Sequence, residues 1–215
     1  MSRRPKRIVV AITGASGAVY AVRLLQELGR CDVDVHLTIS QSGAAVIEQE
    51  LGCRMNLRDA NLAELIGLTP NWSAVSDPLS DVALDRMTYH RFDDFLTPIA
   101  SGSFQTDAMV VCPCSGSTLS GIARAAAANL IQRAAEVHLK EHRKLVLVPR
   151  ETPLSVMQIE NMHRIAQAGG VILPAMPGWY HGVDSLDSIV NFVVSRILDQ
   201  LDVDNTLVSR WKEDA

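Results

Sequence analysis

An arginine and a glutamate stand next to each other directly after an apolar run. The segment "KLVLVPRETP" places Arg150 and Glu151 behind six mostly apolar residues. A guanidinium holds anions such as phosphates, and a carboxylate beside it can accept or release a proton. The alternative is an ion pair on the surface, which contributes little to stability. The pair therefore predicts either an anion site with proton transfer or a solvated ion pair.

Three further corners are rich in glycine and serine. They are "TGASGA", "ASGSF" and "CPCSGST", and each one borders an apolar run. Glycine lets the backbone approach a ligand closely, and the first amides of a helix favour an anion. A tight turn with a serine cap would have the same composition, so both interpretations stay open. The residues concerned are Gly14, Ala15, Ser16, Ser101, Gly102, Ser103, Ser115, Gly116, Ser117 and Thr118.

The first corner does not fit a dinucleotide. The fingerprint G-x-G-x-x-G is absent, because only Ala15 and Ser16 separate the two glycines of "GASG". Ser40 ends the next apolar run, at the place where a carboxylate would hold a ribose. Ser40 can instead cap the following helix or contact a ligand. Glu50 lies ten residues later, and a lone helical glutamate is usually a solvated surface charge.

The last candidate is the loop "PAMPGWYHG". Two prolines and a glycine display Trp179, Tyr180 and His181, and such a loop can cover a pocket. Hydroxyls, glycines and basic groups thus follow the apolar runs, without a cluster of metal ligands. This combination predicts an aromatic, phosphorylated ligand that is held without a metal ion.

Alternating strands and helices would position these residues. Buried strands are expected at 8–13, 33–40, 108–113, 144–149 and 170–175, because these runs are apolar without a break. Helices are expected between and after them, and only short helices and loops in residues 52–100. This order predicts one α/β domain over residues 1–215, a three-layer sandwich with a mainly parallel sheet and a tail at about 203–215. Ligands of such folds bind beyond the carboxyl ends of the strands. The expected helices are 17–28, 43–51, 115–127, 130–142, 153–168 and 185–201.

Composition narrows the functional classes. The chain has 215 residues, of which 47% are hydrophobic, with a net charge of -4. A pI of about 5.8 gives no sign of nucleic-acid binding. No run approaches the ~20 apolar residues of a membrane span, so a cytoplasmic location is expected. The four cysteines lack zinc-site spacing and are expected to be reduced thiols without metal.

Four segments together resemble the flavin prenyltransferase family. They are "ITGASGAVYAVRLL", "ASGSFQTDAMVVCPCSGSTLSGIA", "NLIQRAAEVHLKEHRKLVLVPRETP" and "VILPAMPGWYH". The similarity runs from about residue 7 to Trp211 and is weakest in residues 52–95. "LVPRETP" and "GWYH" are its most specific parts.

The resemblance implies a flavodoxin-like or Rossmann-like fold that binds reduced FMN. It implies that dimethylallyl phosphate donates a prenyl group to N5 of the flavin, followed by ring closure at C6, without a metal. It also implies a homo-oligomer, a dodecamer of ring-like trimers, in which neighbouring subunits complete each site. The product, prenylated FMN, would pass to a decarboxylase of ubiquinone or aromatic-acid metabolism.

Site residues follow from the resemblance by position. Ser16, Glu50, Lys140 and Glu151 would be catalytic. Ser16 would orient or relay the N5 proton, Glu151 would exchange a proton with the phosphate, and Glu50 would help to position the phosphate or relay protons during ring closure. The implied FMN contacts are Gly14, Ala15, Ser16, Ser40, Ser115, Gly116, Ser117, Thr118 and Arg150. The implied contacts of the prenyl substrate are Ser101, Gly102, Ser103, Arg133, Lys140, Tyr180, Arg196 and Trp211.

Two rival functions remain at this stage. An FMN-dependent cysteine decarboxylase would share the first corner, but it would carry Pro-x-Met-Asn where this chain has "PRETP". A non-catalytic FMN carrier would not need Lys140, Glu151, Tyr180 and Arg196. Phe95 also departs from family members that carry tryptophan near that point.

Overall fold

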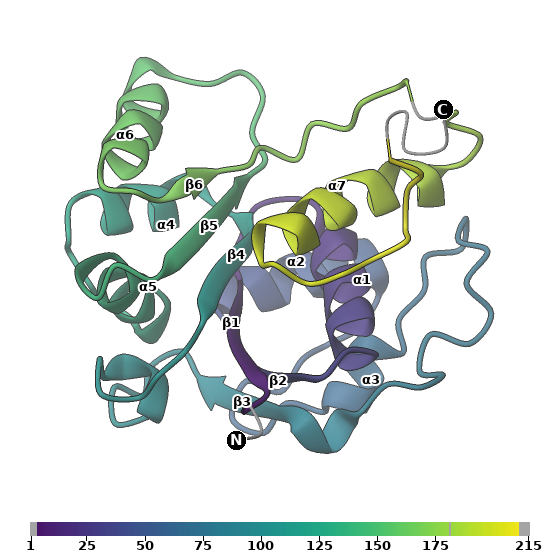
Figure 1. Ribbon diagram of the computed structural model, residues 1–215, viewed down its shortest axis with the longest axis horizontal. Coiled ribbons are helices and arrows are strands. Elements are labelled where there is room, and N and C mark those ends of the chain that lie inside the picture. Colours follow the sequence, from purple (N-terminus) through teal and green to yellow (C-terminus); the bar gives the residue numbers. More distant parts are fainter. Residues whose placement is uncertain (1–3, 181, 211–215) are drawn as a thin grey trace.

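Six strands form one parallel sheet in the order β3-β2-β1-β4-β5-β6 (Figure 1). The computed structural model describes residues 4–180 and 182–210. Every strand pair in the sheet is parallel, so the predicted α/β fold class is confirmed. The strands are β1 (Lys6–Ile12), β2 (Val33–Ile39), β3 (Met87–Arg91), β4 (Ala108–Cys114), β5 (Lys144–Pro149) and β6 (Val171–Ile172).

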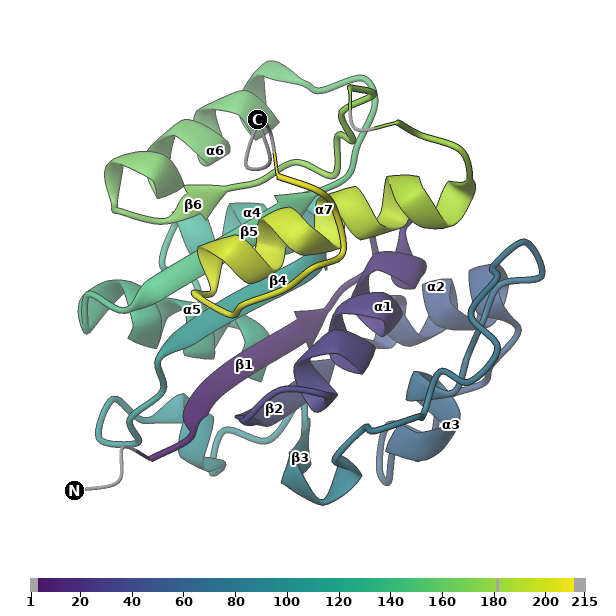
Figure 2. The same cartoon turned by 45° about the vertical axis from the view of Figure 1, so that its right-hand side comes forward.

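Helices cover both faces of the sheet and make the three layers (Figures 1 and 2). On one face lie α1 (Ala18–Gly29), α2 (Gln41–Leu51), α3 (Leu62–Ile66) and α7 (Leu186–Gln200). On the other lie α4 (Gly116–Ala123), α5 (Leu130–Lys140) and α6 (Val156–Gln167). Short 3-10 turns stand at Leu84–Arg86 and Pro98–Ala100. None of the helices in the described ranges is long and apolar enough to span a membrane.

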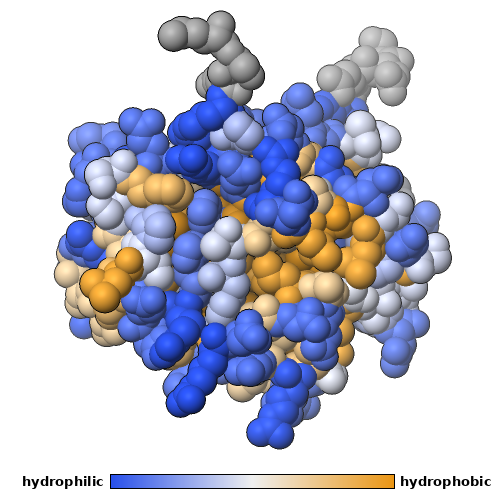
Figure 3. All heavy atoms as spheres, turned by 90° about the horizontal axis from the view of Figure 1, so that it is seen from below, coloured by the Kyte–Doolittle hydropathy of each residue, from blue (hydrophilic) through white to orange (hydrophobic). Residues whose placement is uncertain are grey.

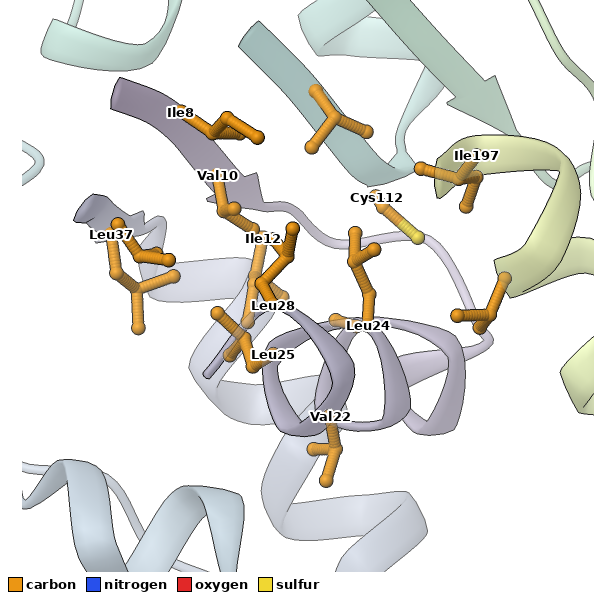
Figure 4. Packing of buried hydrophobic residues seen from close by; sticks show 14 of the residues in the cluster. Ile8, Val10, Ile12, Val22, Leu24, Leu25, Leu28, Leu37, Cys112 and Ile197 are labelled. Atoms are coloured by element: carbon orange, nitrogen blue, oxygen red, sulfur yellow. The ribbon is translucent and has the colours of Figure 1, made fainter. Parts of the chain in front are cut away.

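The unbroken apolar runs are explained by burial of both strand faces. In β1, Ile8, Val10 and Ile12 belong to the core beneath α1 and α7, whereas Val9 and Ala11 belong to the core beneath α4, α5 and α6. Figure 4 shows the first of these sets beside leucines of α1. Because successive side chains of a strand point to opposite faces, a strand between two helix layers needs apolar residues at every position.

One strand was not predicted from the sequence. In β3, "MTYHR", only Met87 and His90 are buried, and the strand lies at the edge of the sheet. An edge strand with one partner needs no continuous apolar run, so it does not stand out among the turn residues of 52–100.

Three expected boundaries were also wrong. The helix expected at 153–168 starts at Val156, because Ser155 and Gln158 form a reciprocal capping box there. The helix expected at 115–127 ends at Ala123, and Asn129 caps the next one. The strand expected at 170–175 is only Val171–Ile172, since Pro174 has no amide to donate to the ladder.

His138 is a buried histidine of α5 whose neutral form has both ring nitrogens satisfied. Its exposed fraction is 1%. Nδ1 lies 2.7 Å from the Ala134 carbonyl oxygen, and Nε2 lies 2.9 Å from the Thr106 hydroxyl. Burial lowers the pKa of His138 from its ordinary value of 6.5 to about 4.

The His138 pKa predicts a loss of stability on acidification. Below pH 6.5 the unfolded chain takes up a proton at this position that the folded chain does not take up until about pH 4. We therefore expect this group to lower the free energy of unfolding by on the order of 2 kcal/mol between pH 7 and pH 5. Urea denaturation of the wild type and of His138→Gln at pH 7 and at pH 5 measures this change in the free energy of unfolding. An equally steep pH dependence in the variant would contradict the assignment.

Candidate functional site

A cavity of about 440 Å³ opens at the carboxyl ends of β1, β4 and β5. It lies where the strand order changes direction, since β1 pairs with β2 on one side and with β4 on the other. Such switch points are where open α/β sheets bind ligands. The lining residues are Gly14, Ala15, Ser115, Gly116, Ser117, Ser120, Arg124, Arg150, Glu151, Met157, Gln158 and Asn161.

Thr13 joins the two strand ends that form the floor of this cavity. Its buried hydroxyl donates to the Pro113 carbonyl at 2.7 Å and accepts from the Ser115 amide at 2.8 Å. Thr13 was not predicted from the sequence, because a threonine before a glycine turn carries no distinctive local signal. The two hydrogen bonds hold the β1 and β4 corners in one arrangement.

The start of α1 is occupied by a side chain of the protein itself. The Glu50 carboxylate accepts hydrogen bonds from the Gly17 amide at 3.0 Å and from the Ala18 amide at 2.8 Å. The expectation that this helix start offers free amides to an anion was therefore wrong. A carboxylate from α2 satisfies these donors and neutralises the positive end of the helix dipole. Glu50 thus lies beside the loop that carries Ser16.

Ser40 caps α2, as one of its two expected roles required. Its hydroxyl accepts from the Gly43 amide at 3.0 Å. A Cβ at Gly43 would lie 2.6 Å from the Ile12 carbonyl oxygen, so α2 approaches the end of β1 too closely for any side chain there. This approach brings Ser40 and Ser42 beside Gly14.

The start of α4, in contrast, remains open toward the cavity. Ser115 caps the helix by accepting from the Thr118 amide at 3.3 Å. The amides of Gly116 and Ser117 precede the first intrahelical donor, and both residues line the cavity. Burial raises the pKa of the neighbouring Cys114 thiol to about 12, so this thiol stays protonated and is no nucleophile. The open amides favour an anion at this point.

Arg150 and Glu151 do not form an ion pair with each other. Arg150 Nε donates to the Ser16 carbonyl at 3.1 Å, which ties the end of β5 to the first corner. The Glu151 carboxylate is exposed and, within residues 4–180 and 182–210, accepts a hydrogen bond only from the adjacent Thr152 amide, at 3.2 Å. Both side chains line the cavity, so the surface-ion-pair alternative does not describe them.

A second group of predicted site residues lies beyond the amino ends of the strands, at the other end of the sheet from the cavity. Lys140 ends α5, just before β5 begins, and pairs with Glu141 beside Gly102. The hydroxyls of Ser101 and Ser103 lie 2.9 Å apart. Arg133, two turns before Lys140, donates to the Ala100 carbonyl at 3.1 Å. The length of β5 separates Lys140 from the cavity by roughly 17 Å, so one chain does not bring Lys140 to Glu151.

A third group surrounds a separate pocket of about 180 Å³ between α7 and the chain after it. Tyr180 and Arg196 line it, and the Tyr180 ring meets Phe192 edge to face at 5.9 Å between centroids. Asp199 accepts from Arg196 at 2.7 Å and from Arg210 at 3.2 Å, so it joins the following segment to α7. His181 and Trp211, both predicted to be near the site, lie outside the described residues.

Several lining residues were not predicted from the sequence. Ser120 lies on α4, Arg124 directly follows that helix, and Gln158 and Asn161 lie on α6; none of them belongs to a strand-end loop. Residues at helical spacing on packed helices are normally assigned to the core or to solvent, so no local signal marks them. Only the packing of α4 against α6 brings them to the cavity.

Comparisons with known proteins give one consistent family. The Flavoprotein family matches residues 1–198. The flavin prenyltransferase UbiX of Alkalihalophilus pseudofirmus is 44% identical over 214 residues, which cover 99% of this chain and 100% of the relative. The crystal structure of AnUbiX (PadA1) in complex with FMN and dimethylallyl pyrophosphate is 36% identical, covers 97% and 98% of the two chains, and has a TM-score of 0.80. A dodecameric FMN-dependent UbiX-like decarboxylase from Escherichia coli O157:H7 is 38% identical over 96% and 99%, with a TM-score of 0.78.

Proposed function

The chain belongs to the flavin prenyltransferase family, and from this membership we propose that it transfers a dimethylallyl group from dimethylallyl phosphate to reduced FMN. The observation that carries the proposal is similarity over nearly the full length to a flavin prenyltransferase. The match covers 99% of this chain, so it spans the strand-end corners that form the cavity. FMN is the acceptor substrate, not NAD or FAD.

The residues of the cavity suit FMN. The open amides of Gly116 and Ser117 and the guanidinium of Arg150 are donors for a phosphate. Gly14 and Ala15 let the backbone of the first corner lie close to the ligand, and the hydroxyls of Ser115 and Ser117 add polar contacts. Glu50 fills the start of α1, so the phosphate belongs at the start of α4.

The reaction exchanges one bond to the allylic carbon for another. The bond from the allylic carbon to the phosphate oxygen would break with its electron pair leaving on the phosphate, and N5 of the flavin, which loses its proton, would take the place of the phosphate on that carbon. Ring closure would then join C6 of the flavin to the far alkene carbon of the prenyl group, with one proton added to the neighbouring alkene carbon and one proton lost from C6. Ser16 holds the N5 proton in position. Arg150 fixes the loop that carries Ser16, because its guanidinium donates a hydrogen bond to the Ser16 carbonyl. Glu151 exchanges a proton with the phosphate group, and Glu50 relays a proton during ring closure. Fixed cations in place of water stabilise the departing phosphate.

The prenyl-phosphate end of the site is completed by neighbouring copies. We assign Arg133, Lys140, Tyr180 and Arg196 to the phosphate, and Ser101, Gly102 and Ser103 to the side of the flavin ring. Because these groups lie outside the strand-end cavity of their own chain, they meet it only across subunit interfaces. We propose a dodecamer.

Exposed apolar side chains support this assembly. Val156, Ile159, Met176 and Trp179 are each more than half exposed in the single chain. Apolar side chains also gather on the face shown in Figure 3. Exposed apolar surface of this extent is typical of protein interfaces.

The proposed surroundings of the enzyme are the cytoplasm and a decarboxylase that uses prenylated FMN. Cys31, Cys53, Cys112 and Cys114 are all free thiols, as is usual in a reducing compartment.

Anaerobic incubation with reduced FMN and dimethylallyl phosphate tests the function. Mass spectrometry is expected to find a flavin heavier by one five-carbon prenyl unit. A protein that binds FMN and forms no adduct would be a flavin carrier. Release of carbon dioxide from a cysteine-ended peptide would favour a cysteine decarboxylase, although "PRETP" stands in place of Pro-x-Met-Asn.

Turnover is expected to persist without magnesium. Lys140, Arg133 and Arg196 supply the positive charge that a metal ion would otherwise bring to the leaving phosphate. The measurement is the rate of prenyl transfer in excess chelator, compared with the rate after magnesium is added back. A rate that collapses in chelator and returns with magnesium would contradict the prediction.

A further inference from the structure

Asn161 is a buried polar residue that the proposed chemistry does not use. It lies on the inner side of α6, and its exposed fraction is 7%. It also lines the strand-end cavity. Within residues 4–180 and 182–210, no hydrogen bond satisfies its carboxamide. Its carboxamide lines the cavity and is free to pair with a group that enters it.

The neighbours of Asn161 are donors of hydrogen bonds. Gln158 lies one turn earlier on the same face of α6, and its Oε1 accepts from the Ser155 amide at 2.8 Å. Its Nε2 is left to face α4, where a Cβ on Gly116 would lie only 3.0 Å away. Ser120 of α4 and Arg124, which directly follows α4, line the same cavity. Among the described residues that line the cavity, Glu151 is the only acidic one, and it lies at the strand end.

This set of donors fits an anion better than a flat apolar ring. Asn161 can turn its NH₂ group toward a ligand oxygen, because either end of a carboxamide can face inward. The open amides of Gly116 and Ser117 lie on the α4 side, and Gln158 and Asn161 lie on the α6 side. A phosphate between these two helices would receive hydrogen bonds from both.

We propose that Asn161 binds the phosphate of FMN, with its carboxamide NH₂ donating to a phosphate oxygen from the α6 side of the cavity. The proposal rests on the proposed function, since it takes FMN as the ligand of this cavity. It adds a second wall to the phosphate site and makes Asn161 a residue that distinguishes FMN from riboflavin, which has the same ring and ribityl chain but no phosphate.

The test compares FMN and riboflavin affinity in matched variants. Asn161→Asp keeps the size of the side chain and places a carboxylate against the phosphate. Asn161→Ala removes the amide without adding charge. Gln167→Glu adds the same charge to the exposed end of α6 and is the control. Dissociation constants from flavin fluorescence are measured with the melting temperature of each variant.

We expect Asn161→Ala to weaken FMN binding about 10-fold, which is the loss of one hydrogen bond to a charged group, and Asn161→Asp to weaken it more. Riboflavin binding should change less than about 3-fold in both variants, and Gln167→Glu should change neither. Unchanged FMN affinity, or equal losses for FMN and riboflavin, would overturn the proposal. If Asn161→Asp does not fold, Asn161→Ala decides alone. A wild-type protein that binds no FMN would instead refute the proposed function.

Discussion

Glu151→Gln is expected to lower the single-turnover rate of flavin prenylation by about 100-fold or more while FMN remains bound. Glutamine keeps the shape of the side chain and removes its ability to exchange a proton. Glu151 lines the cavity next to Arg150, and among the residues that the structure describes its carboxylate accepts a hydrogen bond only from the amide of the next residue. The substitution therefore removes little that stabilises the fold, so a large loss of rate reports on proton transfer.

The experiment for Glu151 needs a matched control on the same part of the chain. Glu160→Gln makes the same chemical change at an exposed position of α6 that does not line the cavity. Rates, FMN affinity and melting temperature are measured for both variants. A near-normal rate for Glu151→Gln would return this residue to a structural role at the end of β5.

Activity is expected to return when two variants that are inactive alone are mixed within one oligomer. Lys140→Ala and Glu151→Gln are each expected to be nearly inactive alone. If every site takes Lys140 from one chain and Glu151 from another, random mixing in equal amounts leaves about one quarter of the sites with both native residues. Mixed oligomers from co-expression should then show about a quarter of the wild-type rate.

The geometry behind this recovery is the position of the two residues on β5. Lys140 precedes the strand and Glu151 follows it, so a single chain holds them at opposite ends of β5. Wild-type chains mixed with the double variant are the control. They should give about one quarter of the wild-type rate for a shared site and about one half for a site within one chain. No recovery in the first mixture would refute the shared site.

Most of the sheet could be predicted from the sequence because its pattern is local. The strands β1, β2, β4 and β5 are short apolar runs, and each is buried on both faces. The corners at Gly14 and Ser115 could be located for the same reason, since a loop that follows a buried parallel strand must lie at the carboxyl end of the sheet. β3 escaped prediction, because an edge strand with an exposed face lacks that pattern.

Side-chain partners could not be predicted in this way. From the sequence, Glu50 is one glutamate on a helix, and only the packing of α2 beside α1 brings its carboxylate to the amides of Gly17 and Ala18. Asn161 is one polar residue in an amphipathic helix, and only the contact of α6 with α4 buries it beside a cavity.

The sequence by itself therefore determined the α/β class, the family and the residue types that the chemistry needs. The grouping of these residues in space was decided only by the tertiary structure. It gathers Ser16, Arg150 and Glu151 at the carboxyl ends of the strands and leaves Lys140 at the amino ends. The physical reason is that strand and turn preferences act between residues near in sequence. The distance between two functional groups depends instead on how strands of fixed length pair and on which helices cover them.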